Sequence, residues 1–141
     1  MGGDEDLPPE EAPAVRVIAM PADTNPYGDI FGGWLMSLMD SAAGSVAARH
    51  AHGRAVTIAV DGMSFQRPVV VGDEVSVYAR LVSVGRTSMK IAVESWRRAR
   101  HDERTYRVTQ ATFTFVAITE DRQPRHVPPM PADEAAPVPA A

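Results

Sequence analysis

The stretch Asn25–Asp40, NPYGDIFGGWLMSLMD, leads from a loop into the helix that decides the fold. Turn-forming residues fill its first half, and from Trp34 to about Arg49 apolar residues recur at steps of three and four. This apolar stripe consists of Leu35, Leu38, Met39, Ala42 and Val46. The opposite face consists of Ser37, Asp40, Ser41, Gly44, Ala47 and Ala48. Because a solvated face normally has Lys, Glu or Gln, we expect a helix covered on both sides, with Asp40 as a lone acid in buried surroundings.

Five segments with strand character accompany this helix. Residues 14–20 precede the loop, and four segments with period-two alternation follow at 55–65, 73–84, 87–99 and 105–118. The links between these four are short, which favours an antiparallel meander in which each strand pairs with the next. Val75, Val77, Ala79 and Leu81 alternate with polar residues and give the sheet one apolar face. The sequence therefore predicts an α+β fold, with a five-stranded antiparallel sheet wrapped around one central helix.

The uncharged second face of the helix needs a cover that a single sheet does not provide. A second copy of the chain is the simplest candidate for that cover. We therefore expect Asp40 to lie near a subunit boundary. The predicted assembly is a homodimer or a trimer of dimers.

Composition limits the classes of function. The chain has 141 residues, enough for one domain with a core, and its hydrophobic share of 45% is typical of a globular protein. The formal charge of −4 argues against a nucleic-acid partner, and the helical segment is too short and too polar to span a membrane. There is no cysteine, and the acidic, Pro-rich start lacks the pattern of a signal peptide, so we expect a cytoplasmic protein. We predict a domain at 14–120 between a tail at 1–13 and a Pro/Ala-rich tail at 121–141.

Three runs carry a resemblance to a known family. They are ADTNPYGDIFGGWLMSLMD at 22–40, HGRAVTIAVDGMSFQRPVVVGDEV at 52–75 and GRTSMKIAVE at 85–94. Together they resemble the short bacterial acyl-CoA thioesterases of the hotdog fold, the YciA-type branch, over roughly 20–116. The resemblance implies hydrolysis of an acyl-CoA substrate to a free carboxylic acid and CoA. It implies no metal and no cofactor apart from the CoA that is part of the substrate.

The resemblance also assigns residues to roles. Asn25 and Asp40 match the positions of the family's catalytic asparagine and aspartate, so Asp40 is predicted to be the general base or nucleophile and Asn25 to assist it. The chemistry of the residues agrees, since thioester hydrolysis needs a group that activates water and donors for the developing oxyanion. The N–H groups near Gly32 and Gly33, at the positive end of the helix dipole, can be those donors.

Arginines suggest where the phosphates of CoA bind. Arg86, Thr87 and Ser88 at a hairpin turn are one choice, because arginine pairs with phosphate and small hydroxyls can donate beside it. Arg67 is a second choice. We expect a further basic cluster, Arg97, Arg98, Arg100, Arg104 and Arg107, to keep a hairpin soluble and its strand edges unpaired.

Each assignment has a structural or functional alternative. Asp40 can be a buried acid paired with an arginine, and Asn25 before Pro26 can be a turn former. A hotdog hydratase or dehydratase would use a histidine with an acid, but no histidine precedes His50 in the loop and helix. A non-catalytic acyl-CoA-binding or regulatory module stays open, since fold alone does not exclude it. His50 and His52 lack an acid that would complete a ligand set, so we expect no metal site.

Overall fold

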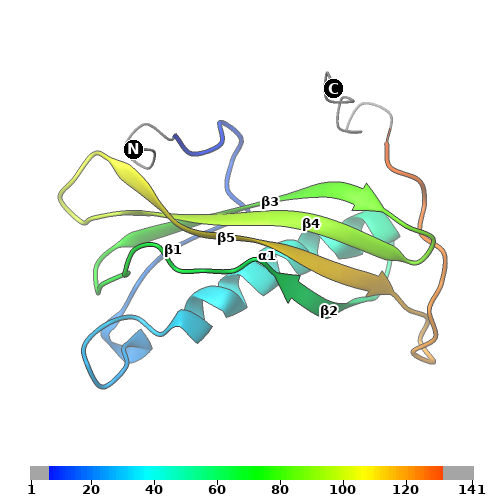
Figure 1. Cartoon of the computed structure of the whole chain (residues 1–141), viewed down its shortest axis with the longest axis horizontal. Helices are drawn as coiled ribbons and strands as arrows, with labels where there is room; N and C mark the ends of the chain where they lie inside the picture. The colour runs from blue at the N-terminus through cyan, green and yellow to red at the C-terminus, as the bar shows by residue number, and fades with distance from the viewer. Residues whose placement is uncertain (1–6, 132–141) are drawn as a thin grey trace.

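The computed structural model describes residues 7–131, in which one long helix lies along one face of a curled sheet (Figure 1). The helix is α1 (Gly32–Ala51), and a short 3₁₀ helix, η2 (Pro21–Asp23), precedes it. The strands are β1 (Val15–Ile18), β2 (Ala55–Asp61), β3 (Glu74–Val84), β4 (Ser88–Arg98) and β5 (Thr105–Ala117). The predicted α+β fold, five antiparallel strands around one helix, is confirmed.

The order of the strands corrects one part of the prediction. The sheet runs β1-β3-β4-β5-β2, so β2 pairs with β5 and not with β3 as a simple meander requires. Residues 62–73 carry the chain between β2 and β3, and backbone bonds hold them: Gln66 N–H donates to Val108 O over 2.8 Å, and Ile30 N–H donates to Val69 O over 3.0 Å. As a result β2 lies at one edge of the sheet and β1 at the other.

The core lies between α1 and the sheet. From the helix it takes Leu35, Met39, Ala42, Ala43, Ala47 and Ala51, and from the three long strands residues such as Val75, Val77, Met89, Ile91, Phe113 and Phe115. Ala47 was predicted for the opposite face of the helix but is fully buried. Alanines at these positions let the helix backbone approach the sheet closely, which explains why this buried face is rich in small residues.

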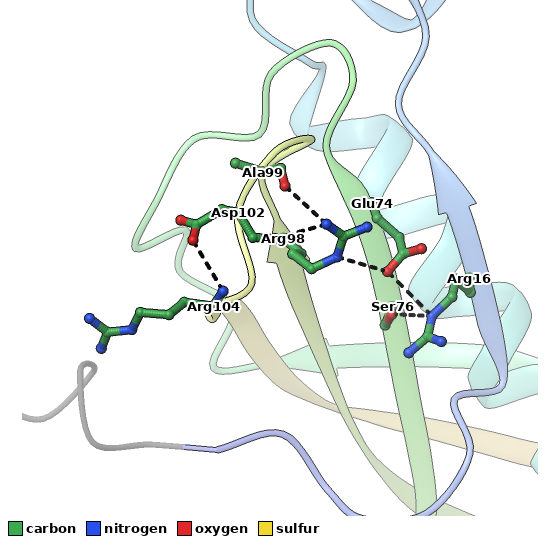
Figure 2. A network of polar contacts seen from close by, with 7 residues as sticks. All are labelled: Arg16, Glu74, Ser76, Arg98, Ala99, Asp102 and Arg104. Atoms are coloured by element: carbon green, nitrogen blue, oxygen red, sulfur yellow. Dashed lines mark hydrogen bonds and ion pairs between the residues drawn. The ribbon is translucent and has the colours of Figure 1, made fainter.

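Polar side chains tie the strands together at the end of the sheet where β3 begins (Figure 2). Arg16 on β1 donates from Nε to Ser76 Oγ over 2.8 Å and lies 3.8 Å from Glu74. Arg98 on β4 lies 3.5 Å from the same Glu74 carboxylate and donates to the Asp102 carbonyl over 2.8 Å. Exposed ion pairs of this kind contribute at most about 1 kcal/mol each. They hold β1, β3 and the β4–β5 turn in register.

Residues 118–131, which we call the C-terminal strap, pack against the end of the sheet and of α1. Arg125 Nη2 donates to Ala51 O over 2.8 Å, and Val127 N–H donates to Arg86 O over 2.9 Å. His50 Nε2 lies 2.9 Å from Pro128 O. Thus part of the predicted tail 121–141 has an ordered packing role, and the rest of it lies outside the described residues. The domain boundaries predicted from sequence stay a prediction.

Candidate active site

A cavity of about 280 Å³ lies at the start of α1, and we call it the first cavity. Its apolar wall includes Ile30, Leu35, Phe65, Val69 and Val108. Its polar side chains include Asn25, Asp29 and Arg67. An apolar pocket with a few polar groups is the usual form of a small-molecule site. Two predicted site residues, Asn25 and Gly32, and the second choice for a CoA contact, Arg67, are therefore brought together in one place.

The loop before α1 fixes the orientation of the Asn25 amide. Its Oδ1 accepts the backbone N–H groups of Tyr27 over 2.9 Å and Asp29 over 3.1 Å. Gly28, with φ of 89°, supplies the left-handed backbone position that this tight turn requires. Because two backbone donors occupy Oδ1, the Nδ2 group of Asn25 is the part of the side chain that can donate to a ligand. Asn25 is therefore both a turn former and a candidate donor.

The helix begins without a side-chain cap. Phe31 is the N-cap residue and makes no capping hydrogen bond from its side chain, so the first-turn N–H groups of Gly32 and Gly33 stay available. A Cβ at Gly32 would lie 3.3 Å from Phe65 Cζ, whereas a Cβ at Gly33 would meet nothing within 4 Å. Glycine at position 32 therefore lets the phenyl ring of Phe65 close over the helix start. Gly33 adjoins the first cavity but is not among the residues that line it.

Asp40 is exposed in the single chain. Its predicted burial depends on a second copy of the chain covering this face of the helix, and that cover stays a prediction. Its Oδ1 accepts a hydrogen bond from the Thr57 hydroxyl over 2.6 Å, a short distance typical of a bond to a charged acceptor. Among residues 7–131 it makes no ion pair, so no arginine within the described part of the chain is its partner. Thr57 on β2 was missed from sequence, because nothing local indicates that β2 lies beside this helical turn.

The predicted residues do not form one site within one chain. Asp40 follows Gly32 by eight residues, which is about 12 Å along a helix axis, and it does not line the first cavity. Arg86, Thr87 and Ser88 lie at the opposite end of the sheet, where Thr87 O accepts the Ala117 N–H over 3.0 Å. A single chain therefore brings together the candidate donors and Arg67, but neither the Asp40 carboxylate nor the phosphate contacts predicted at 86–88.

Three arginines surround the ring of Tyr106 next to the first cavity, an arrangement that the sequence did not predict. Arg67, which lines the cavity, has its guanidinium 4.8 Å from the centre of the Tyr106 ring. Arg97 and Arg104 lie 5.6 and 5.1 Å from the same ring. Cation–π contacts of this kind occur within about 6 Å of a ring centre. Arg97 and Arg104, which we expected only to keep a hairpin soluble, thus lie around Tyr106 close to the candidate site.

Among residues 7–131, no group of three or more His, Cys, Asp or Glu side chains could hold a metal ion. No helix in the same range has the length and hydropathy needed to cross a membrane.

Solved structures of similar proteins have the same fold. The hexameric thioesterase y2039 from Yersinia pestis matches with a TM-score of 0.81 at 47% identity, covering 86% of this chain and 99% of that one. A hexameric broad specificity acyl-coenzyme A thioesterase matches with a TM-score of 0.83 at 42% identity, covering 95% of this chain and 93% of that one.

These structures correct the predicted assembly. Both proteins are described as hexamers, which contradicts a homodimer as the complete assembly and is consistent with the other predicted option, a trimer of dimers. The homodimer option failed because one uncovered helix face identifies one contact between copies and does not count the further copies that join.

The sequence places the chain in a family. A family model described as the Thioesterase superfamily matches residues 27–103. An uncharacterized acyl-CoA thioester hydrolase of Zymomonas mobilis is 63% identical over 126 residues, which cover 89% of this chain and 85% of the relative. Acyl-CoA thioester hydrolase YciA of Escherichia coli is 50% identical over 117 residues, which cover 81% of this chain and 89% of the relative. The chain belongs to the thioesterase superfamily, with its YciA-type acyl-CoA thioester hydrolases as homologues, as its sequence motifs predicted.

Proposed function

We propose that the protein hydrolyses acyl-CoA thioesters to a free carboxylic acid and CoA. The first cavity carries this proposal, because it joins an apolar wall that suits an acyl chain to the Asn25 amide and the uncapped start of α1. The names of the relatives support the same activity. Relatives with solved structures include an aspartate-to-alanine and an asparagine-to-alanine variant, the two residue types proposed here as catalytic.

In the proposed reaction the thioester carbonyl oxygen lies at the start of α1. Negative charge that develops on this oxygen is stabilised by the N–H groups of Gly32 and Gly33 and by Asn25 Nδ2. Asp40 acts as general base or as nucleophile. As a base it takes a proton from water while the water oxygen bonds to the carbonyl carbon, then the C–S bond breaks and the sulfur leaves as the CoA thiol after protonation.

The separation between Asp40 and the first cavity points to a site shared by two subunits. β2 is an edge strand with unpaired backbone groups, and Val56 and Ile58 on it are exposed at 38% and 58%. In a two-fold contact across this edge the two copies of α1 run antiparallel, so the start of one helix faces the later turns of the other. Asp40 of the partner subunit then completes the first cavity. We propose a hexamer as the assembly, because the similar solved structures are hexamers.

The same arrangement accounts for two sets of candidate CoA contacts. Arg67 lies in the first cavity, whereas Arg86 with Thr87 and Ser88 lies at the far end of the sheet. An antiparallel partner brings its far end toward the first cavity, so both sets can reach one CoA molecule. Arginine suits its phosphates because the guanidinium forms two parallel hydrogen bonds. The cytoplasmic location stays a prediction from sequence.

A thiol-release assay with acyl-CoAs of increasing chain length tests the proposal. Asp40→Asn should lower kcat by about 10²–10⁴, the usual contribution of a general base. Its thermal midpoint should change by no more than about 2 °C, because the side chain is exposed and an amide oxygen still accepts from Thr57. Asp121→Asn is the matched control, since it removes an exposed acid from the C-terminal strap and should leave kcat unchanged. Binding of acyl-CoA without thiol release by the native protein would instead identify a non-catalytic module.

A further inference from the structure

A second cavity, of about 620 Å³, lies at the other end of α1. It is enclosed by the last turns of α1, the middle of β3 and the C-terminal strap, and Glu11 borders it from the N-terminal side. It shares no lining residue with the first cavity. Its volume lies within the range of roughly 300–1,000 Å³ that is common for ligand pockets. Neither the proposed hydrolysis nor the packing of the core requires this second cavity.

Two arginines without partners line the second cavity. Arg49 on α1 and Arg80 on β3 are exposed, and neither makes a side-chain hydrogen bond or an ion pair with any residue in the range 7–131. The other charged or titratable groups on the lining are His50, His52 and Glu11. His50 Nε2 already contacts Pro128 O over 2.9 Å, so this histidine helps to hold the strap in place. Arg49 and Arg80 are therefore the two arginines of the lining that have no side-chain partner among residues 7–131.

The remaining wall is apolar. Val46 from α1, Ala79 and Leu81 from β3, and three prolines of the strap complete the lining. The prolines are Pro128, Pro129 and Pro131. A ligand that satisfies both parts of this lining has an anionic group for the arginines and an apolar body for the rest.

Because the second cavity lies at the C-terminal end of α1, it favours some anions over others. The C-terminal end of α1 carries the negative end of the helix dipole, which opposes a multiply charged group such as a pyrophosphate. A carboxylate carries a single charge, and its two oxygens match the fork of an arginine. A monocarboxylate therefore fits this end of the helix better than a polyphosphate.

We propose that the second cavity binds a carboxylic acid with an aliphatic chain. Its carboxylate pairs with Arg49 and Arg80, and its chain lies along Val46, Leu81 and the strap prolines. The bond from His50 to Pro128 positions the strap as the outer wall. This proposal does not depend on the proposed reaction, because binding is measured on the protein without any thioester.

Isothermal titration of the full-length protein with decanoate tests the proposal. Decanoate should bind, and the double variant Arg49→Gln/Arg80→Gln should weaken its binding by about tenfold or more, since it removes two charged hydrogen-bond donors. Arg100→Gln is the matched control, because Arg100 is exposed and lines neither cavity. Acetate should bind at least ~100-fold more weakly than decanoate, because each buried methylene strengthens binding about fourfold. The double variant should keep the thermal midpoint of the native protein.

Several outcomes would overturn the proposal. Equal decanoate affinity in the native protein and the double variant would place the ligand elsewhere. Loss of decanoate binding in Arg67→Gln, with the double variant unaffected, would assign it to the first cavity. Tight binding of inorganic pyrophosphate that the double variant abolishes would make the site a polyanion site. Absence of decanoate binding to the native protein would reject the carboxylate ligand, while the thiol-release assay would still decide the proposed function separately.

Discussion

Replacement of Asn25 by aspartate separates the two roles that the structure gives this side chain. In the native protein Oδ1 accepts two backbone N–H groups, over 2.9 and 3.1 Å, and Nδ2 is the group proposed to donate to the thioester oxygen. Asn25→Asp keeps an acceptor for both N–H groups and removes only the donor. Asn25→Ala removes the donor and both turn bonds.

The two variants should therefore differ in stability, and both should lose activity. Loss of two neutral hydrogen bonds at roughly 0.5–1.5 kcal/mol each should make Asn25→Ala about 1–3 kcal/mol less stable, while Asn25→Asp should stay within about 0.5 kcal/mol of the native protein. Loss of one oxyanion donor should lower kcat by about 10²–10³ in both variants. The new charge in Asn25→Asp adds to that loss, because it repels the developing oxyanion.

Denaturant unfolding and thiol release on the same preparations measure both quantities. Gln123→Glu is the control for an amide-to-acid change, since Gln123 is exposed and lies in the C-terminal strap. The reasoning is refuted if Asn25→Asp keeps kcat within threefold of the native value, on the scale of the ~10²–10³ expected for a lost donor. Equal destabilisation of both variants would refute the assignment of Oδ1 to the turn.

Three other substitutions test separate contacts. Thr57→Val keeps the side-chain shape but removes the hydroxyl that donates a hydrogen bond to Asp40 over 2.6 Å, so kcat should fall about tenfold with KM unchanged. Thr57→Ser should restore kcat, and an unchanged kcat in Thr57→Val would rule out a positioning role. Gly32→Ala places a methyl group 3.3 Å from Phe65, so kcat/KM should fall. The midpoint of unfolding should not fall, because alanine favours a helix over glycine by about 0.5–1 kcal/mol. Gly33→Ala, with open space around it, should show the smaller kinetic effect. Gly53→Ala would bring a methyl group within 2.6 Å of Arg125 Nη2 and displace its bond to Ala51 O, so stability should fall by about 1 kcal/mol. In a protein that already carries Arg125→Ala, the same Gly53→Ala change should cost nothing further.

Local patterns predicted the elements well, because each element is encoded by its own periodicity. The helix expected from Trp34 to Arg49 runs from Gly32 to Ala51, and every predicted strand is present. The partner of β2 was not predictable in the same way. Strand pairing depends on where residues 62–73 lead the chain. That path rests on backbone bonds from this segment to Ile30 and Val108 rather than on any local pattern.

The candidate site was predictable only in part for a related reason. Asn25 and Gly32 share one loop and helix start, so their proximity follows from the sequence. The contact between Asp40 and Thr57 joins residues 17 positions apart on different elements, so it follows only from the tertiary fold. The number of subunits depends on surfaces that no periodicity describes, which is why the sequence did not decide between a homodimer and a trimer of dimers.

The exposure of Asp40 in one chain is consistent with its proposed role in a shared site. A carboxylate that was buried within the monomer would lose its hydration during folding and would need a charged partner inside the core. In the proposed shared site, an exposed Asp40 would keep its hydration until a second subunit and the substrate cover it, and the Thr57 hydroxyl would then continue to satisfy one of its oxygens. The remaining oxygen is left for water or the thioester. A neutral hydroxyl partner suits the proposed role as a base, since a paired arginine would stabilise the ionised carboxylate and weaken it as a proton acceptor.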